Sequence, residues 1–395
     1  MSLILLSLAL LGLLLGGWLL WRRQAAPPPP LRNQPDAPLA PHAPRAPAAT
    51  PTTHRASAPL GAPAAGPGQA QLPALPPEAL GSFRWAEPAA LADAQRQALQ
   101  DAVRHIPRPP AALHQLLSPQ FLERASSAEL AELINGEARI AAKVLASVNA
   151  PYYGLTKPVS GIGQAVTFLG LNTVRSICMQ SMLESAFKPT SPALKQAHDT
   201  IWAASALASE LCTRLSAKLG LADAGALVAQ VLLSFLGHLA TATLMSQQAN
   251  GQAAAPTGGP LLDRTRAAQD ALGLGPAEIG GLLLRQWGLP EAIVDEVRAI
   301  DRLLVTAAGE LPAPSSQRLA VAHLCARLGE HLAAGVPVSG SALAGLATGQ
   351  AMADDGFHLR AHLAAPALAR LPEHLQAADL VQALHSLQQG MRLRR

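Results

Sequence analysis

The stretch that decides the fold is Ser191–Gly220, which reads SPALKQAHDTIWAASALASELCTRLSAKLG. Its apolar residues recur at steps of three and four, which places them on one face of an α-helix: Ile201, Ala204, Ala208, Leu211 and Leu215. Ser191 followed by Pro192 is a typical helix start, and Gly220 is a typical helix end. The stretch therefore predicts one long helix with a buried face.

The next stretch predicts a second long helix. Ala226–Met245 is apolar on nearly every side, which is typical of a helix at the centre of a bundle. Its length approaches that of a membrane span, but small and polar residues interrupt it: Ser234, Gly237, His238, Thr241 and Thr243. We therefore expect a buried core helix here and not a membrane helix.

The composition extends the helical prediction to the rest of the folded chain. Of 395 residues, 49% are hydrophobic and only 3% are aromatic, and Ala and Leu dominate, a combination that favours helices over strands. The formal charge is +4, and tight basic clusters occur only at Arg22–Arg23 and Arg392–Arg395. A nucleic-acid interface needs a basic face or stripe. We expect an all-α protein without a nucleic-acid partner, whose terminal arginines are a solvated tail or a contact for anionic lipid.

The N-terminus predicts a membrane anchor at residues 1–23. Leu3–Trp21 is an apolar run long enough to span a bilayer, with Trp18, Trp21, Arg22 and Arg23 at its end. A cleaved signal peptide would carry its basic residues before the apolar core, so a retained helix is favoured. Because basic residues stay on the cytoplasmic side, we expect a single-pass protein of the inner (cytoplasmic) membrane with most of the chain in the cytoplasm.

The remainder of the chain divides into three predicted segments. Residues 24–87 are rich in Pro and Ala and begin with the run Pro27–Pro30, which predicts a disordered linker because such a segment buries little apolar surface. Residues 88–310 are predicted to form a helical domain, and residues 311–395 a C-terminal helical extension.

Cysteine usage fits the predicted compartment. The three cysteines, Cys178, Cys212 and Cys325, are odd in number, widely spaced and set in apolar helical patterns. This is typical of core residues in a reducing compartment and not of a disulfide framework.

Four motifs in the predicted domain carry a family resemblance. They are IPRPP at 106–110, VNAPYYG at 148–154, SGIGQAVTFLGL at 160–171, and EIG at 278–280 followed by WGLP at 287–290. In this order the region resembles the HDOD family, helical output domains that are non-catalytic relatives of HD and HD-GYP metal phosphohydrolases. The resemblance implies a multi-helix bundle, with these signature positions: Asn149, Tyr153, Gly170, Trp287 and Pro290.

The same resemblance implies that the metal site of the phosphohydrolases is lost. Where relatives have a His in an aromatic-Trp-x-His-Ser pattern, this chain has Ala204. Where they have His-Asp, it has Ser234 and Phe235, and a third His position is Pro276. These side chains cannot supply the fixed set of N, O or S donors that a divalent metal needs. We therefore expect no catalytic residues, no bound metal and no cofactor.

Two other groups of residues have side chains that could act as metal ligands. His198-Asp199 lies several residues before the matched motif, and it is interpreted as a polar position on a helix. Asp354, Asp355, His358 and His362 have a spacing that places both histidines on one helical face. This group lies outside the matched region and looks like a helix start, so a structural interpretation is favoured. The chain has no Gly-rich phosphate loop and no Cys pair at metal spacing.

The sequence therefore predicts a membrane-anchored, non-catalytic HDOD-like signalling or regulatory module that binds a protein partner. One alternative is an HD-related metal-dependent phosphohydrolase with displaced ligands, drawn from Asp301 or from the group at 354–362. A second alternative is a structural membrane tether that uses the linker to hold a component near the membrane.

Overall fold

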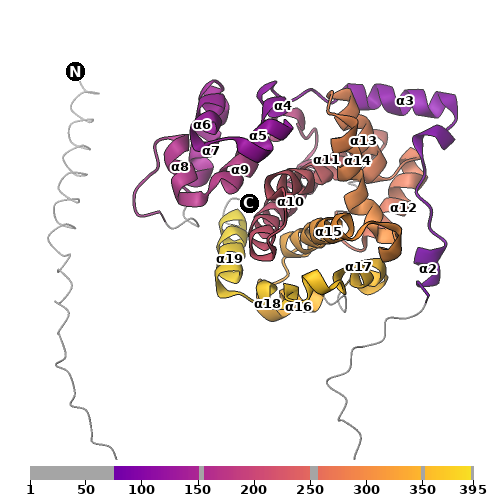
Figure 1. Ribbon diagram of the computed structural model, residues 1–395. Coiled ribbons are helices and arrows are strands. Elements are labelled where there is room, and N and C mark those ends of the chain that lie inside the picture. Colours follow the sequence, from indigo (N-terminus) through magenta and orange to yellow (C-terminus); the bar gives the residue numbers. More distant parts are fainter. Residues whose placement is uncertain (1–74, 151–154, 250–256, 348–351, 393–395) are drawn as a thin grey trace, which may run out of the picture. The chain divides into compact units, whose positions relative to one another are not determined.

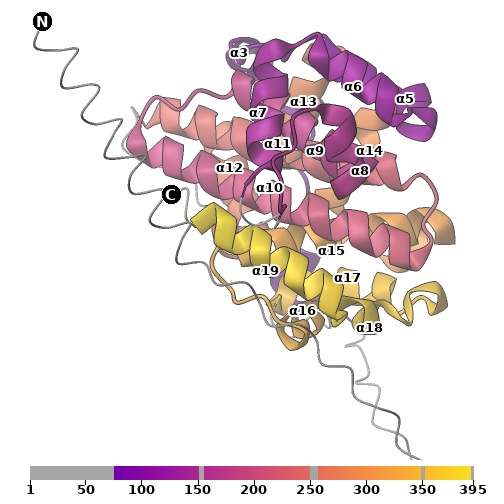
Figure 2. The ribbon, with the colours of Figure 1, turned by 90° about the vertical axis from the view of Figure 1, so that its left-hand side faces the viewer.

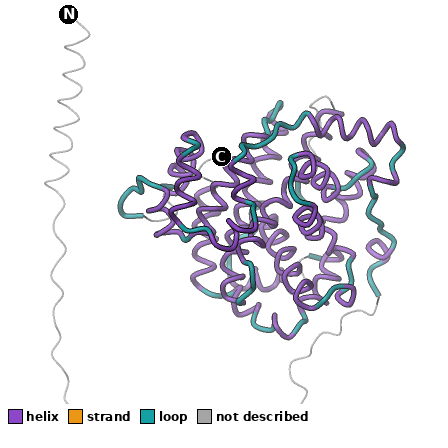
Figure 3. Tube along the Cα trace, turned by 45° about the horizontal axis from the view of Figure 1, so that its top comes forward, coloured by secondary structure: helices purple, strands orange, loops and turns teal. Residues whose placement is uncertain are grey.

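The structure is a computed structural model that describes residues 75–150, 155–249, 257–347 and 352–392. The chain divides into two units, Met1–Gly68 and Gln69–Arg395, and every described residue belongs to the second. Helices joined by short loops make up this described part, which contains no strand (Figure 3). The predicted all-α class is confirmed. The predicted anchor, with Leu3, Trp18, Trp21, Arg22 and Arg23, and linker residues 24–74 lie outside the described residues.

Two long helices and three partners form the centre of the described unit (Figure 1). Helix α10 packs between α11 and α15, while α13 and α14 pack against α11. The five helices are α10 (Pro192–Leu219), α11 (Ala224–Gln248), α13 (Pro276–Gln286), α14 (Glu291–Arg302) and α15 (Ala313–Ala333). The predicted ends of α10 are confirmed, because the Ser191 hydroxyl accepts a hydrogen bond from the Leu194 amide at 3.2 Å and Gly220 adopts the left-handed conformation.

Helix α11 is the predicted core helix. Among the described residues it is the single helix long and apolar enough to cross a bilayer by length and composition, and 94% of its apolar window is buried inside the domain. Its polar interruptions, Ser234, His238 and Thr241, are also buried. The helix therefore lies in the protein core, in agreement with the prediction.

A group of shorter helices precedes this centre and covers one side of it (Figure 2). The group comprises α4 (Ala112–Leu116), α5 (Pro119–Arg124), α6 (Ser127–Asn135), α7 (Ala138–Val148), α8 (Ile162–Leu169) and α9 (Leu171–Leu183). Helix α6 begins with a capping box, in which Ser126 and Glu129 each satisfy the backbone amide of the other. Helix α9 packs against α10 and α11 and so joins the group to the centre.

The predicted C-terminal extension shares the core of the predicted domain. Helix α15 lies along α10, and the last helices pack on these two: α16 (Gly340–Ala347), α17 (Gly356–Leu363), α18 (Leu371–Leu375) and α19 (Ala378–Arg392). Buried residues on both sides of residue 310, such as Leu211, Leu324 and Leu384, belong to one hydrophobic cluster. The boundary predicted at residue 310 therefore separates two parts of a single core.

Residues 75–92, here called the strap, differ from the predicted disordered linker. They contain α2 (Glu78–Gly81) and a single turn at Pro88–Ala90, and they lead into α3 (Asp93–Arg104). Leu80 and Phe83 are buried in a small cluster with residues of α12 (Leu261–Leu272) and with Leu304. The burial of these two large apolar side chains offsets the conformational entropy that this short segment loses when it is ordered. The packed chain thus starts before residue 88.

The three cysteines have the predicted environment. Cys178, Cys212 and Cys325 are free thiols on α9, α10 and α15, and all are buried. Burial raises the pKa of the Cys178 thiol to about 12. All three therefore act as small core residues in this fold.

Candidate functional site

The positions at which the family resemblance implies a lost metal site lie close together, around His238. Ala204 on α10 and Phe235 on α11 line a void of about 10 Å³, and Pro276 at the start of α13 lines a neighbouring void of about 20 Å³. His238 and Arg264 line both voids. Ser234 donates its hydroxyl hydrogen to the carbonyl of Val231 in its own helix at 2.8 Å. The structure therefore brings three of the four expected positions together.

Close helix packing leaves little space at this centre. Phe235 is 1% exposed. A Cβ atom on Gly237 would collide with the carbonyl oxygen of Pro276, so α11 and α13 approach closely there. A Cβ atom on Gly329 of α15 would likewise collide with the backbone of Ala204. A void of 10 to 20 Å³ has room for about one water molecule, so this centre has no space for a substrate.

Five charged or ionisable side chains form a central charge cluster beside these voids: His238, Arg264, Asp301, Arg327 and Glu330. Asp301 accepts a hydrogen bond from His238 Nε2 at 2.9 Å and a second from Arg327 Nη2 at 2.9 Å. Glu330 lies 2.9 Å from Arg327 Nη1 and 2.7 Å from Arg264 Nη2. The cluster joins α11, α12, α14 and α15, and each charge in it faces an opposite one.

The pKa directions show that this cluster holds ionised carboxylates at neutral pH. Burial alone would raise the pKa of Asp301, but Arg327 and His238 together lower it well below its ordinary range. Burial likewise opposes ionisation of Glu330, and Arg264 and Arg327 lower its pKa. Burial lowers the pKa of the neighbouring His323 to about 4, and its Nδ1 bonds to the carbonyl of Ile300 at 2.6 Å.

Asp301, a candidate displaced ligand, is therefore bonded within the protein through both of its carboxylate oxygens. Each of its carboxylate oxygens has a protein donor, whereas a metal ligand needs a lone pair directed at the ion. Two guanidinium groups occupy the surroundings, and they would repel a divalent cation. The donor set at this centre suits an internal ion-pair network better than it suits a metal.

The other proposed ligand group does not converge either. His362 is buried, with Nδ1 bonded to the Ser316 hydroxyl at 2.7 Å and Nε2 to the carbonyl of Thr306 at 2.9 Å. Asp355 accepts hydrogen bonds from the backbone amides of Leu261 and Leu262 at the start of α12. Asp354 is exposed and His358 is half-buried. Among the described residues, no three His, Cys, Asp or Glu side chains are arranged to hold a metal ion.

His198 and Asp199 point to different partners. Asp199 forms an ion pair with Lys195 one turn earlier on α10 at 2.5 Å. His198 is buried, and its Nε2 bonds to the hydroxyl of Thr243 on α11 at 3.1 Å. The dipeptide is thus divided between the surface and the core.

The signature positions have structural tasks in this fold. The amide of Asn149 bonds to both the carbonyl and the amide of Val159, at 2.8 and 2.7 Å, and thereby joins the two sides of the intervening loop. Gly170 joins α8 to α9 with φ of +82°, a conformation that favours glycine. Trp287 is buried and Pro290 directly precedes α14. Tyr153 lies outside the described residues.

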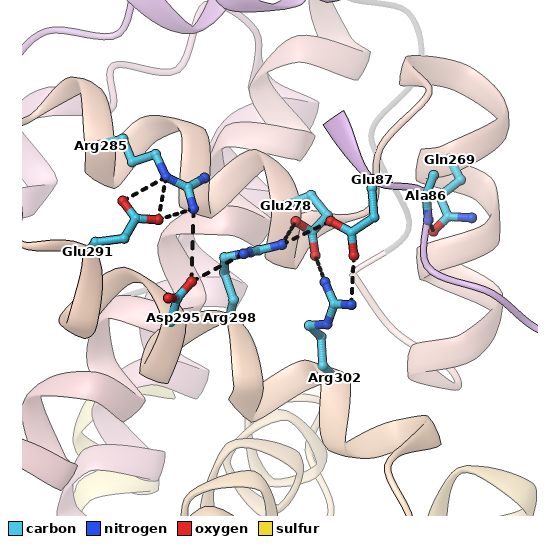
Figure 4. Close-up of polar contacts among 9 residues, drawn as sticks. All are labelled: Ala86, Glu87, Gln269, Glu278, Arg285, Glu291, Asp295, Arg298 and Arg302. Carbon is cyan, nitrogen blue, oxygen red and sulfur yellow. Dashed lines mark hydrogen bonds and ion pairs between the residues drawn. The ribbon is translucent and has the colours of Figure 1, made fainter. Parts of the chain in front are cut away.

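A second buried carboxylate, Glu278 of the EIG motif, forms ion pairs that the motif does not predict (Figure 4). Glu278 on α13 is fully buried and paired with Arg298 and Arg302 of α14, and both arginines also bind Glu87 of the strap. We call these four residues the strap clamp. The spacing of the two arginines predicts a shared helix face, but nothing in the local sequence points to carboxylates that lie 211 and 20 residues away from Arg298.

Further contacts dock the strap beside the clamp. Gln269 of α12 accepts a hydrogen bond from the amide of Ala86 at 3.0 Å and donates one to the carbonyl of Arg84 at 3.3 Å. The guanidinium of Arg302 lies 6.0 Å from the centre of the Trp85 ring, within reach of a cation–π interaction. The strap is therefore held by apolar burial, hydrogen bonds and ion pairs together.

Comparison with known families confirms the resemblance found in the sequence. The model of the HDOD domain matches residues 106–303, which is half of the chain, so the protein belongs to the HDOD family. A comparison with curated proteins finds no match.

Comparison with solved structures finds matches of low sequence identity. A protein provisionally named a phosphohydrolase from Shewanella amazonensis SB2B is 19% identical, with 74% of this chain and 98% of that chain covered and a TM-score of 0.46. An HDOD domain protein of unknown function from Geobacter sulfurreducens is 14% identical, with 72% and 98% covered and a TM-score of 0.44. A protein provisionally named for signal transduction from Marinobacter aquaeolei VT8 is 20% identical, with 78% and 68% covered and a TM-score of 0.43.

Proposed function

We propose that this protein is a non-catalytic HDOD signalling or regulatory module, anchored in the membrane, that binds a protein partner. The observation that carries the proposal is the central charge cluster. Both carboxylate oxygens of Asp301 accept hydrogen bonds, one from His238 and one from Arg327. The positions matched to metal ligands line voids of only about 10 and 20 Å³. These two features support a non-catalytic role, because a metal site needs free donor atoms and a phosphate ester needs a larger cavity.

An exposed aromatic residue supports the partner-binding part of the proposal. Phe168 on α8 is 58% exposed, and among the described residues it and Leu75 are the exposed large hydrophobic side chains. Aromatic side chains of this kind are enriched among the anchor residues of protein interfaces. Phe168 belongs to the stretch 160–171 that carries the family resemblance, so we assign the partner contact to the face of α8.

Capture from cells tests the partner contact. Phe168→Ser removes the aromatic side chain without touching the core, and Leu75→Ser is the matched control because Leu75 is also exposed. We expect full-length protein and Leu75→Ser to retain the same partner after cross-linking, and Phe168→Ser to lose it. Equal retention by Phe168→Ser and the parent would contradict a partner contact on α8.

Fractionation tests the anchor. The proposal retains Leu3–Trp21 as a membrane helix with Arg22 and Arg23 on the cytoplasmic side. Deletion of residues 1–23 should move the protein from the membrane to the soluble fraction, and a reporter fused after Arg395 should report the cytoplasm. A periplasmic reporter signal would overturn the topology. If the anchor-deleted protein still captures the partner, the protein is a binding module; if capture requires the anchor, the structural tether is favoured.

A further inference from the structure

An open groove lies away from the central charge cluster, between the N-terminal helix group and α10. Its volume is about 740 Å³, within the range of roughly 300 to 1,000 Å³ that is usual for small-molecule sites. Its walls come from α7, from the C-terminal end of α9 with the loop that follows, from the first half of α10, and from Met391 on α19. A molecule bound there would contact four separate helices.

One wall of the groove is apolar and firmly supported. Ile140, Phe187 and Trp202 line it, and each of the three is largely buried. The ring of Phe187 packs edge-on against Trp202 at 6.3 Å and against Trp287 at 6.4 Å between ring centres. Such a wall offers a preformed surface for an apolar body.

The rim of the groove has an excess of positive charge. Of its charged residues, Lys143 pairs with Glu184 and Lys195 pairs with Asp199. Arg139 and Lys188 also line the groove, are exposed, and have no carboxylate partner within the described part of the chain. Glu137 is the one remaining acidic residue of the lining. After pairing, two cations face one carboxylate, which leaves a net charge of one positive unit for a ligand to meet.

His198, one of the residues that line the groove, has a hydrogen-bond acceptor without a donor. Thr243 donates its hydroxyl hydrogen to the carbonyl of Leu239 at 2.8 Å, so its oxygen must accept the hydrogen bond from His198 Nε2. His198 lines the groove, and burial lowers its pKa to about 4, so the ring is neutral and Nδ1 has a lone pair. This Nδ1 is buried and has no hydrogen-bond partner in the protein. An unpaired buried acceptor raises the free energy of the folded protein, and a ligand that donates a hydrogen bond to it would lower that free energy.

We propose that this groove binds a small organic monoanion that has an apolar body and a hydrogen-bond donor. The anionic group lies at Arg139 and Lys188, the apolar body lies against Ile140, Phe187 and Trp202, and the donor serves His198. The proposal is independent of the partner contact on α8, because Phe168 does not line the groove.

Anilinonaphthalene sulfonate is a suitable probe, because it combines a sulfonate, two aromatic ring systems and one N–H group. Phenyl naphthylamine has the same body without the sulfonate and is the matched neutral probe. The protein for this experiment is the fragment Gln69–Arg395, which contains both hydrophobic clusters of the described structure and forms one compact unit. Its cooperative thermal unfolding is verified first, because unfolded or molten chains also bind the sulfonate probe.

We expect the sulfonate probe to bind the fragment at one saturable site. Arg139→Glu and Lys188→Glu should each weaken this binding about tenfold or more, because each reverses a charge beside the sulfonate, while binding of the neutral probe stays unchanged. Lys157→Glu makes the same charge change at an exposed lysine outside the groove and should have no effect. Ser185→Trp places a large side chain at the groove wall and should abolish binding of both probes.

The proposal is overturned if the folded fragment shows no saturable binding of the sulfonate probe. It is equally overturned if Arg139→Glu, Lys188→Glu and Lys157→Glu all weaken binding to the same extent, since this would mean a general charge effect. Binding of the sulfonate probe that survives Ser185→Trp would place the site elsewhere and would also reject the groove.

Discussion

The central charge cluster and the strap clamp use the same chemistry in different surroundings. Each surrounds a buried carboxylate, Asp301 or Glu278, with basic groups. In the central charge cluster every partner is a side chain of the helix core, whereas in the clamp the arginines also reach Glu87 of the strap, which is nearly half exposed. Buried ion pairs thus fill an interior centre in one place and attach a peripheral segment in the other.

The largest expected effect comes from opening the interior cluster. Arg327→Met should destabilise the fold by about 3 to 5 kcal/mol, because it leaves Asp301 and Glu330 short of a buried partner. Chemical denaturation of the fragment Gln69–Arg395 measures this loss.

The stability of Arg327→Met should also depend on pH differently from that of the parent. In the parent, the pKa of Asp301 is lower in the folded state than in the unfolded state. The ionised carboxylate therefore stabilises the fold above the unfolded-state pKa of about 3.9, and this stability is lost as the pH falls through the folded-state pKa. Without Arg327, the folded pKa of Asp301 should be higher than in the parent, so the ionised carboxylate should contribute less stability to the variant. The difference from the parent should therefore shrink toward acidic pH. A difference that is constant with pH would show that the ionisation of Asp301 is not involved.

The second effect concerns Phe235, which fills the centre beside the cluster. Phe235→Ala should create a cavity and cost about 3 to 5 kcal/mol, while Phe168→Ala is a matched control because its ring is exposed. Ser234→His combined with Phe235→Asp should not produce hydrolysis, since it adds a buried carboxylate without the remaining ligands. An unchanged melting temperature for Phe235→Ala would mean that the ring is not a core residue.

The smallest effect is expected at the strap clamp. Burial opposes ionisation of Glu87, but Arg302 and Arg298 lower its pKa. Glu87→Gln should cost about 0.5 kcal/mol, and the cost should decline at high salt because water and salt screen this site. Asp101→Asn, which removes an exposed carboxylate paired with Arg104, is the control. Limited proteolysis should cut the strap faster in Glu87→Gln; equal cutting rates would exclude a docking role for the clamp.

Local patterns predicted the helices well, because helix formation depends on spacings that the sequence displays. The apolar steps of three and four in α10 and its ends at Ser191 and Gly220 all belong to one segment of the chain. The degenerate positions Ala204, Phe235 and Pro276 were found through family resemblance, and the structure places them around one residue, His238.

Contacts between distant segments were not predictable in the same way. Asp301 and Arg327 are on different helices, and Glu87 meets Arg302 across 215 residues, so no local spacing reveals either pair. The Pro-rich composition continues to Pro88 and conceals Leu80 and Phe83, two apolar residues that suffice to dock the strap. The histidine spacing at 358 and 362 fits a metal pair, but Ser316 and Thr306 occupy both nitrogens of His362.

Metal analysis of the full-length protein, combined with a phosphodiester hydrolysis assay, tests the central claim most directly. Because arginines and a histidine hold the buried carboxylates of the central charge cluster, we expect no stoichiometric divalent metal and no hydrolysis, with or without added manganese or zinc. A stoichiometric transition metal whose removal abolishes a measured turnover would contradict the account and would identify the protein as an enzyme.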